Sequence, residues 1–371
     1  MSDKLTFCFF GVSLDPWDGE DRVALRRAYI RSSIAGKSEF PLFPDPYNAL
    51  KCYLRDLFAS PSFKEAGKVP VESWLTPTPH PDDLKLVTTL NYAVFIDSNG
   101  CREYATKVKN FVCQNIQDIP VMFGIDHSST GGAVEALVEK HGSDNLSVII
   151  LDSHSDFLPM ELRYGMIKHQ RETSEENLQT NLAYDPFRFR RPESYNAGTF
   201  VFHLLKERIL SPERIVLAGV SDHPPPSSRY KDPLVSRAID FYNGMENQGI
   251  RIITKEAIKR KTRETIHSLF DKISTKYLYL SIDIDIGAIA ALYGARQILE
   301  PPIVGLNVRE LYQTIDTIRK CYAEKKMELA GLDLMETDVY KAGMPLRSGR
   351  ADRTFEIEAN ILRKLLCDEP K

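Results

Sequence analysis

The chain has 371 residues, of which 43% are hydrophobic, and its formal net charge is −3 with a pI near 6.3. A chain of this length and composition can bury a sizeable core. The slightly acidic balance, with scattered Lys and Arg, argues against nucleic acid or a membrane as the main partner. Six cysteines without a C-x-x-C pair indicate reduced thiols, no disulfides and a cytoplasmic protein.

The first predicted elements are a strand and a helix. The strand, over 5–12, is too short to span a bilayer, and it lacks a cleavage pattern. Residues 36–90 are rich in proline, which predicts an irregular surface excursion holding one helix near 47–59. A further strand is expected over 90–97.

From residue 100 onwards, predicted helices and strands alternate. We expect helices over 100–116, up to His141 and from Phe200, and strands over 120–125, 147–151, 214–220, 277–282 and 329–335. The alternation predicts a single α/β domain over 1–371, with a second irregular excursion at about 157–195.

Four of these strands end in acidic or imidazole side chains. After the strand over 147–151, extended backbone would place Asp152, His154 and Asp156 on one side. The other three strands lead into Asp126 and His127, into Asp283 and Asp285, and into Glu336. In open parallel sheets, ligands bind beyond the carboxyl ends of the strands, so these side chains are expected to share one pocket.

These segments resemble the motifs of the ureohydrolase family, which includes arginases, agmatinases and formimidoylglutamases. Residues 123–128 are similar to its G-G-D-H-S motif, 152–156 to D-A-H-x-D, 281–285 to S-x-D-x-D and 331–336 to G-x-D-x-x-E. The resemblance implies a divergent member with a three-layer αβα fold and a mainly parallel sheet, as in arginases and deacetylases. It also implies a homo-oligomer, a trimer or a hexamer.

The acidic and imidazole side chains together suit a binuclear metal site. The expected ligands are His127, Asp152, His154, Asp156, Asp283 and Asp285. Four carboxylates and two imidazoles are too many for one ion and roughly neutralise two divalent cations. Their oxygen-rich character favours manganese or magnesium, manganese being the expected ion, with zinc, iron or cobalt left open. Two such ions can lower the pKa of a shared water to about neutrality for attack on a planar carbon.

The expected reaction is hydrolysis of a guanidine or amidine C–N bond in a small molecule. By resemblance, Glu336 faces the substrate's cationic group, and we expect charge-assisted hydrogen bonds there. The catalytic candidates are Asp156, Glu336 and His223; the substrate contacts are Glu336, Asn196 and Arg347; the supporting residues are Asp126, Ser128, Ser155 and Ser281. Arg347 lies in a Gly-containing loop whose cations would meet a substrate carboxylate or remain solvated.

The chain departs from the family pattern at two places. The histidine of the family's H-G-T segment is replaced by Asn196 or Ala197, neither of which titrates near neutrality. His169 and His223 are possible replacements, whereas His203 is expected to pack within its helix. After Asp285 the family's Asp-Pro pair is missing, and such changes around a metal site commonly weaken metal affinity.

Two other functions remain open on these residues. The first is a regulatory or non-catalytic protein that keeps its metals but lost turnover with the histidine. The second is an amide hydrolase similar to deacetylases, although those enzymes use one zinc ion and lack the paired S-x-D-x-D motif. Measuring urea release together with metal content separates these possibilities.

Overall fold

The structure is a computed structural model that describes residues 6–37, 41–163, 194–221, 223, 233–297, 305–346 and 348–367. Its centre is one eight-stranded sheet with the order β2-β1-β3-β8-β7-β4-β5-β6, in which all neighbours are parallel. The strands are β1 (Phe7–Val12), β2 (Phe63–Lys68), β3 (Ile119–Gly124), β4 (Leu146–Leu151), β5 (Ile215–Val220), β6 (Arg251–Thr254), β7 (Tyr277–Asp283) and β8 (Glu328–Met335).

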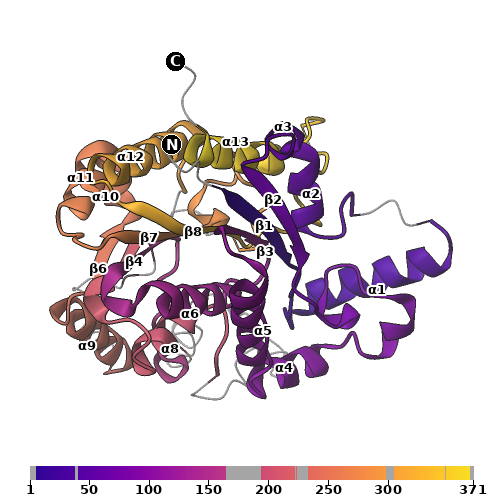
Figure 1. The fold of residues 1–371 in the computed structure, drawn as a ribbon. Coiled ribbons are helices and arrows are strands. Elements are labelled where there is room, and N and C mark those ends of the chain that lie inside the picture. Colours follow the sequence, from indigo (N-terminus) through magenta and orange to yellow (C-terminus); the bar gives the residue numbers. More distant parts are fainter. Residues whose placement is uncertain are drawn as a thin grey trace.

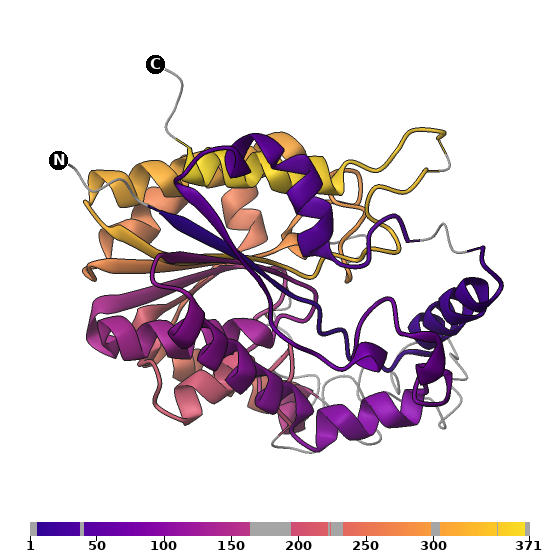
Figure 2. The same ribbon diagram turned by 45° about the vertical axis from the view of Figure 1, so that its right-hand side comes forward.

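Helices cover both faces of the sheet (Figures 1 and 2). The lower layer of Figure 1 contains α4 (Thr89–Asp97), α5 (Gly100–Asn115), α6 (Ser129–His141), α8 (Phe200–Lys206) and α9 (Pro233–Asn247). The upper layer contains α2 (Pro46–Tyr53), α3 (Arg55–Phe58), α10 (Lys255–Arg260), α11 (Thr262–Asp271), α12 (Val308–Glu324) and α13 (Thr354–Leu366). The three-layer αβα fold is therefore confirmed, with a sheet that is entirely parallel.

The core consists of two apolar layers, one on each side of the sheet. Along β4, Val148 and Ile150 pack into one layer, whereas Ile149 and Leu151 pack into the other. All six residues of β4 are buried, as expected for a central parallel strand with both faces covered. This burial explains why the apolar run is continuous and why its polar residues begin only where the sheet ends.

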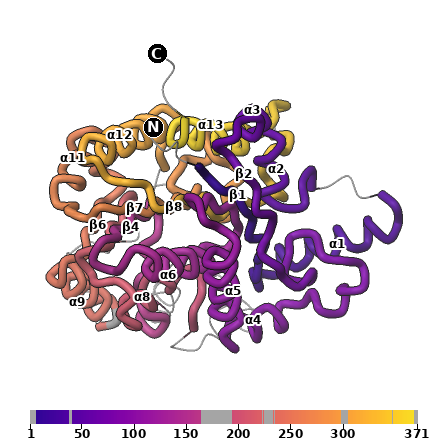
Figure 3. The backbone as a smooth tube through the Cα atoms, viewed as in Figure 1, coloured from indigo at the N-terminus to yellow at the C-terminus, as the bar shows by residue number. Residues whose placement is uncertain are grey.

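Helix α1 (Glu20–Ile34) projects to the right of the sheet in the tube drawing (Figure 3). Two buried arginines attach it to the rest of the molecule. Arg22 donates two hydrogen bonds to Asp338, at 2.7 and 2.5 Å, and Arg26 forms an ion pair of 2.5 Å with Asp15. No helix among the described residues is both long and apolar enough to cross a membrane.

The predicted strand over 90–97 is wrong, because this segment forms helix α4. The Thr88 side chain caps the helix by accepting a hydrogen bond from the Asn91 backbone N–H at 3.1 Å. Within the helix, Tyr92 and Ile96 are buried four residues apart, while Leu90 and Val94 are more than half exposed. This spacing belongs to a helix, and a short apolar run does not by itself distinguish a helix from a strand.

Residues 36–90 contain more regular structure than was expected. The helix predicted near 47–59 is present as α2 and α3, but the segment also contributes β2, which pairs with β1. The sequence of β2 is Phe-Lys-Glu-Ala-Gly-Lys, without β-branched residues, and none of its residues is buried. Edge strands are often charged because one side of their backbone is unpaired, so they lack the apolar pattern of central strands.

Helix α13 buries Glu358 completely, next to the loop that follows β8. The Thr337 hydroxyl donates a hydrogen bond of 2.6 Å to one carboxyl oxygen, and the other oxygen has no hydrogen-bond partner. Burial raises the pKa of Glu358 from its usual 4.5 to about 8. Glu358 is thus mostly protonated at neutral pH.

This burial makes a pH-dependent contribution to stability. Between pH 4.5 and about 8 the folded state keeps a proton that the unfolded state releases, so Glu358 destabilises the fold increasingly as the pH rises. A Glu358→Gln variant has no such proton. We expect the difference in free energy of unfolding, variant minus wild type, to increase between about pH 5 and about pH 9. The increase should be about 1.4 kcal/mol per unit of pKa shift, a few kcal/mol in all.

Urea denaturation of both proteins at the two pH values, with chelator throughout, measures this difference. A stability gap between variant and wild type that does not change with pH would show that Glu358 ionises normally.

Candidate metal centre

The four strands that carry the predicted ligands are neighbours at the centre of the sheet, in the order β3-β8-β7-β4. In this register Leu151 lies beside Ile282, and Asp283 lies beside Met335, so the strands end at a common edge. The residues that follow therefore meet. Among the described residues, three groups have potential ligand atoms that lie within 4.8 Å of one another inside each group. They are His127, Asp152 and Asp283; Asp152, His154 and Asp285; and Asp283, Asp285 and Glu336.

His127 is fully buried and is oriented by a chain of hydrogen bonds. Its Nε2 lies 2.9 Å from the Ser281 hydroxyl, which in turn donates to Asp333 Oδ1 at 2.6 Å. Asp333 also accepts hydrogen bonds from the hydroxyls of Thr130 and Tyr279. Because the Ser281 hydroxyl donates its proton to Asp333, it must accept the hydrogen bond from His127 Nε2–H. This arrangement leaves the lone pair of His127 Nδ1 directed at the cluster.

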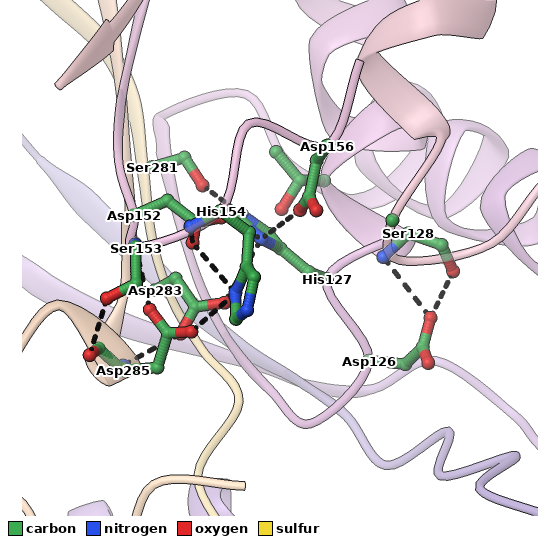
Figure 4. A network of polar contacts seen from close by, with 12 residues as sticks. Asp126, His127, Ser128, Asp152, Ser153, His154, Asp156, Ser281, Asp283 and Asp285 are labelled. Atoms are coloured by element: carbon green, nitrogen blue, oxygen red, sulfur yellow. Dashed lines mark hydrogen bonds and ion pairs between the residues drawn. The ribbon is translucent and has the colours of Figure 1, made fainter. Parts of the chain in front are cut away.

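The Nδ1 atom of His127 faces three carboxylates. Its distances to Oδ2 of Asp152, Asp156 and Asp283 are 3.2, 3.2 and 3.3 Å (Figure 4). Burial disfavours the charged imidazole, but the three carboxylates raise the pKa of His127 above its usual value. Four ligand atoms thus converge in a site where a positive charge is strongly favoured.

A second group forms around His154, beside Asp285 (Figure 4). His154 Nδ1 lies 2.7 Å from Asp285 Oδ2 and 3.6 Å from Asp152 Oδ1. The backbone N–H of Ser153 donates to Asp285 Oδ1 at 3.0 Å, and the Asp285 N–H donates to Asp283 Oδ1 at 2.8 Å. Backbone donors therefore fix these carboxylates while leaving oxygens free for a ligand.

Lys255, at the start of α10, was not among the predicted site residues. Its ammonium group is buried and donates to the Ser153 hydroxyl, which donates to the Asp285 carbonyl at 2.8 Å. Burial lowers the pKa of Lys255, while the cluster carboxylates oppose this change. The lysine follows a four-residue strand at the far edge of the sheet, and nothing in its local sequence indicates that it reaches the centre.

Two of the clustered acidic residues have left-handed backbone conformations, Asp156 with φ 50° and Glu336 with φ 65°. Such values are uncommon for residues other than glycine and concentrate at functional sites. Glu336 is buried, and its Oε2 has no hydrogen-bond partner. Burial raises the pKa of Glu336 to about 8, against the lowering effect of Arg296.

Arg296 connects three of the loops around the cluster. Its guanidinium group lies 3.0 Å from Asp126 Oδ2 and 3.1 Å from Asp15 Oδ1, and its backbone N–H donates to the Glu336 carbonyl at 2.7 Å. The guanidinium also lies over the Trp17 ring, 4.8 Å from its centroid. Arg296 was not predicted as a site residue, because its acidic partners are distant in sequence.

The predicted supporting residues have distinct positions. Ser128 donates from its hydroxyl and its backbone N–H to Asp126, and this pair lies to one side of the cluster (Figure 4). Ser281 forms a hydrogen bond with His127, one of the proposed metal ligands. Ser155 forms a hydrogen bond of 2.7 Å with the Tyr242 hydroxyl.

Asn196 is engaged within its own loop. Its side-chain oxygen accepts from the Gly198 N–H at 3.0 Å, and its amide nitrogen lies 3.3 Å from the Ser194 hydroxyl. These hydrogen bonds give Asn196 a part in shaping the loop, and its contact with a substrate stays a prediction.

The histidines are also separated by the structure. His223 packs edge to face against Tyr242, with ring centroids 4.6 Å apart. It therefore contacts the residue whose hydroxyl bonds to Ser155. His203 packs in α8 against Tyr195, as expected. His169 and Arg347 lie outside the described residues.

The donor set fits two divalent cations. The cluster contains buried polar atoms without hydrogen-bond partners: His127 Nδ1, Asp152 Oδ2, Asp285 Oδ2 and Glu336 Oε2. Buried polar atoms are normally satisfied, and several acceptors facing each other are the expected exception at a cation site. The two imidazoles and the surrounding carboxylates supply nitrogen and oxygen ligands of the kind that manganese and related ions take.

Comparison with known proteins defines the class. The chain matches the model of the arginase family over residues 55–367, and it belongs to that family. It is 27% identical over 218 residues to proclavaminate amidinohydrolase of Streptomyces clavuligerus, covering 58% of this chain and 53% of the relative. It is 24% identical over 283 residues to the human mitochondrial guanidino acid hydrolase, covering 76% of this chain and 63% of the relative.

Among solved structures, the arginase of Bacillus subtilis superposes with a TM-score of 0.57 at 15% identity, covering 99% of this chain and 100% of the arginase. This likeness supports the fold. The sequence matches to the two curated relatives span less than two thirds of their lengths.

Proposed function

We propose that this arginase-family protein is a binuclear metal hydrolase that cleaves a C–N bond of a guanidine or amidine. The observation that carries the proposal is the convergence of two histidines and three aspartates at one sheet edge, with buried polar atoms that lack hydrogen-bond partners. A fourth aspartate, Asp156, joins them through its oxygen at 3.2 Å from His127 Nδ1. The names of the two curated relatives refer to amidino and guanidino hydrolysis, which agrees with this reaction.

In this proposal the metal ligands are His127, Asp152, His154, Asp156, Asp283 and Asp285, and manganese is the expected metal. Two divalent ions, when bound, supply a water molecule of lowered pKa as the nucleophile. Asp156 directs Oδ2 to the cluster, and its Oδ1 would be available to accept a proton. Glu336 binds the cationic head of the substrate through charge-assisted hydrogen bonds, which positions its carbon for attack.

Protonation of the leaving amine needs a group other than the family's histidine. His223 is our candidate, because it packs edge to face against Tyr242, whose hydroxyl contacts Ser155 in the loop that carries the proposed ligands. A general acid typically contributes about a hundredfold or more to the rate. A His223→Ala variant with an unchanged kcat would exclude this role.

The remaining proposals concern the whole protein. We expect residues 1–371 to act as one arginase-like domain, to assemble as a homo-oligomer and to reside in the cytoplasm. The substrate is a small molecule, with no nucleic acid or membrane involved.

The test is product release from a panel of substrates by manganese-loaded and chelator-treated protein. The panel contains arginine, agmatine, guanidino acids, a formimino acid and an acetylated amine. Urea, ammonia, formamide and acetate are measured, and metal content is determined alongside. We expect metal-dependent release from at least one guanidine or amidine. Two bound ions without turnover of any compound would favour the non-catalytic alternative, whereas cleavage of an acetylated amine alone would favour the amide hydrolase.

A further inference from the structure

We propose that Arg163 is a specificity-determining residue that receives a carboxylate on the substrate's tail, so that the substrates are guanidino or amidino acids. The inference rests on the proposed function, because it assigns the part of the substrate that lies away from the reacting carbon. Neither the metal ligands nor Glu336 can attract such a group, since the ligands are mostly carboxylates and Glu336 is itself acidic.

Arg163 lies beside the proposed metal site. Its Nη1 atom is 3.9 Å from Asp156 Oδ1, while the other oxygen of the same carboxylate faces His127 Nδ1 at 3.2 Å. The guanidinium is thus one carboxylate away from the ligand atoms. Because its side chain is 26% exposed, it can be reached from solvent, unlike the buried arginines 22, 26 and 296.

The loop over 194–199 is shaped to hold this guanidinium. Arg163 Nη1 donates to the Gly198 carbonyl at 2.9 Å, and a Cβ atom on Gly198 would lie only 1.5 Å from Nη1. The Asn196 side chain accepts from the Gly198 N–H, and the Thr199 hydroxyl donates to the Ser194 carbonyl at 2.8 Å. The loop that lacks the family's histidine therefore presents a backbone carbonyl and an open space to Arg163.

The guanidinium keeps donors for a ligand. Arginine has five N–H donors, and the Gly198 carbonyl takes one of them. At 3.9 Å the Asp156 oxygen is beyond hydrogen-bond distance, so this contact is electrostatic only. A planar fork with unused donors binds carboxylates in a bidentate manner. The same charge repels an ammonium tail, which adds selection against substrates such as agmatine.

A structural role for Arg163 makes a different prediction. If Arg163 only compensates the charge of Asp156, its loss would change metal binding and affect all guanidines equally. If it reads the tail, its loss would affect substrates according to their tail charge. The comparison of ligands that differ only in the tail therefore separates the two roles.

The experiment uses metal-loaded full-length protein with 4-guanidinobutyrate, its amide, and agmatine. KM is measured for compounds that turn over, and Kd by calorimetry for those that do not, so the ratio between carboxylate and amide is obtained either way. The variants are Arg163→Met, Arg163→Lys and Gly198→Ala. The matched control is Arg237→Met, which removes an exposed arginine paired with Glu161.

Wild type is expected to prefer the carboxylate over the amide by about tenfold to a hundredfold, the range for charge-assisted hydrogen bonds. Arg163→Met should abolish this preference, Arg163→Lys should keep part of it, and Gly198→Ala should reduce it by displacing the guanidinium. Arg237→Met should keep the preference in full.

A wild type that binds carboxylate and amide equally, or a preference that survives in Arg163→Met, would overturn the inference. Absence of turnover for every guanidine, with the carboxylate preference intact in binding, would count against the proposed reaction while supporting the role of Arg163.

Discussion

Replacing Asp156 or Asp285 by Asn is expected to lower the metal content of the purified protein from two ions per chain to one or fewer. Each substitution removes a charged ligand from a site whose attraction for cations is largely electrostatic. Asp156 lies in the group around His127 Nδ1, and Asp285 lies 2.7 Å from His154 Nδ1. The two variants therefore affect different ends of the cluster.

Elemental analysis after incubation with manganese and dialysis gives the count directly. Asp316→Asn is the matched control, because Asp316 pairs with Lys364 on the surface, between α12 and α13. We expect this control to bind two ions, as wild type does. A wild-type content near zero would contradict the binuclear site, and two ions retained in both Asn variants would contradict the assignment of these ligands.

Loss of metal in these variants is not expected to result from unfolding. Without metal, the site holds several carboxylates in close contact, and burial together with Asp152 raises the pKa of Asp156 to about 6. A neutral Asn at this position relieves part of the repulsion. The metal-free Asp156→Asn protein should therefore be at least as stable as metal-free wild type, as thermal unfolding with chelator can show.

The central part of the fold and of the site could be predicted from the sequence. A strand buried on both faces is apolar along its whole length, so polar residues such as Asp152 and Asp283 mark the point where it leaves the sheet. The alternation of side chains then indicates which of them share a side. For this reason the proposed ligands could be grouped before the order of the strands was known.

Other features depend on contacts between distant segments. Lys255, the first residue of α10, and Arg296, in a loop, both reach the cluster region. The sequences around them carry no pattern that gives the direction of either side chain. Asp333 was noticed within a motif, but its role in orienting His127 through Ser281 depends on the pairing of β7 with β8. The edge strand β2 was missed because its exposure removes the apolar signal.

Glu336→Gln is expected to lower kcat/KM for a guanidine substrate by about a hundredfold or more while the protein keeps two metal ions. The pKa of about 8 applies to Glu336 without bound cations, and two metal ions together with a cationic substrate would favour its ionised form. Hydrogen bonds to charged groups contribute about 1.5–3 kcal/mol each, and the amide replaces a carboxylate oxygen by an N–H₂ group that faces the substrate's cation. The loop should persist, since Gln retains the backbone carbonyl that accepts from the Arg296 N–H at 2.7 Å.

The matched control for this substitution is Glu358→Gln. Glu358 is also a buried glutamate, and it accepts a hydrogen bond from Thr337, the residue that follows Glu336. Its pKa of about 8 makes Glu358 largely neutral at pH 7, so the amide should leave kcat/KM there close to the wild-type value. Steady-state kinetics and metal analysis of both variants give the comparison. A carboxyl oxygen of Glu336 also lies within 4.8 Å of Asp283 and Asp285. A loss of metal in Glu336→Gln would therefore indicate that Glu336 is a metal ligand. Unchanged kinetics with full metal content would show that Glu336 does not bind the substrate.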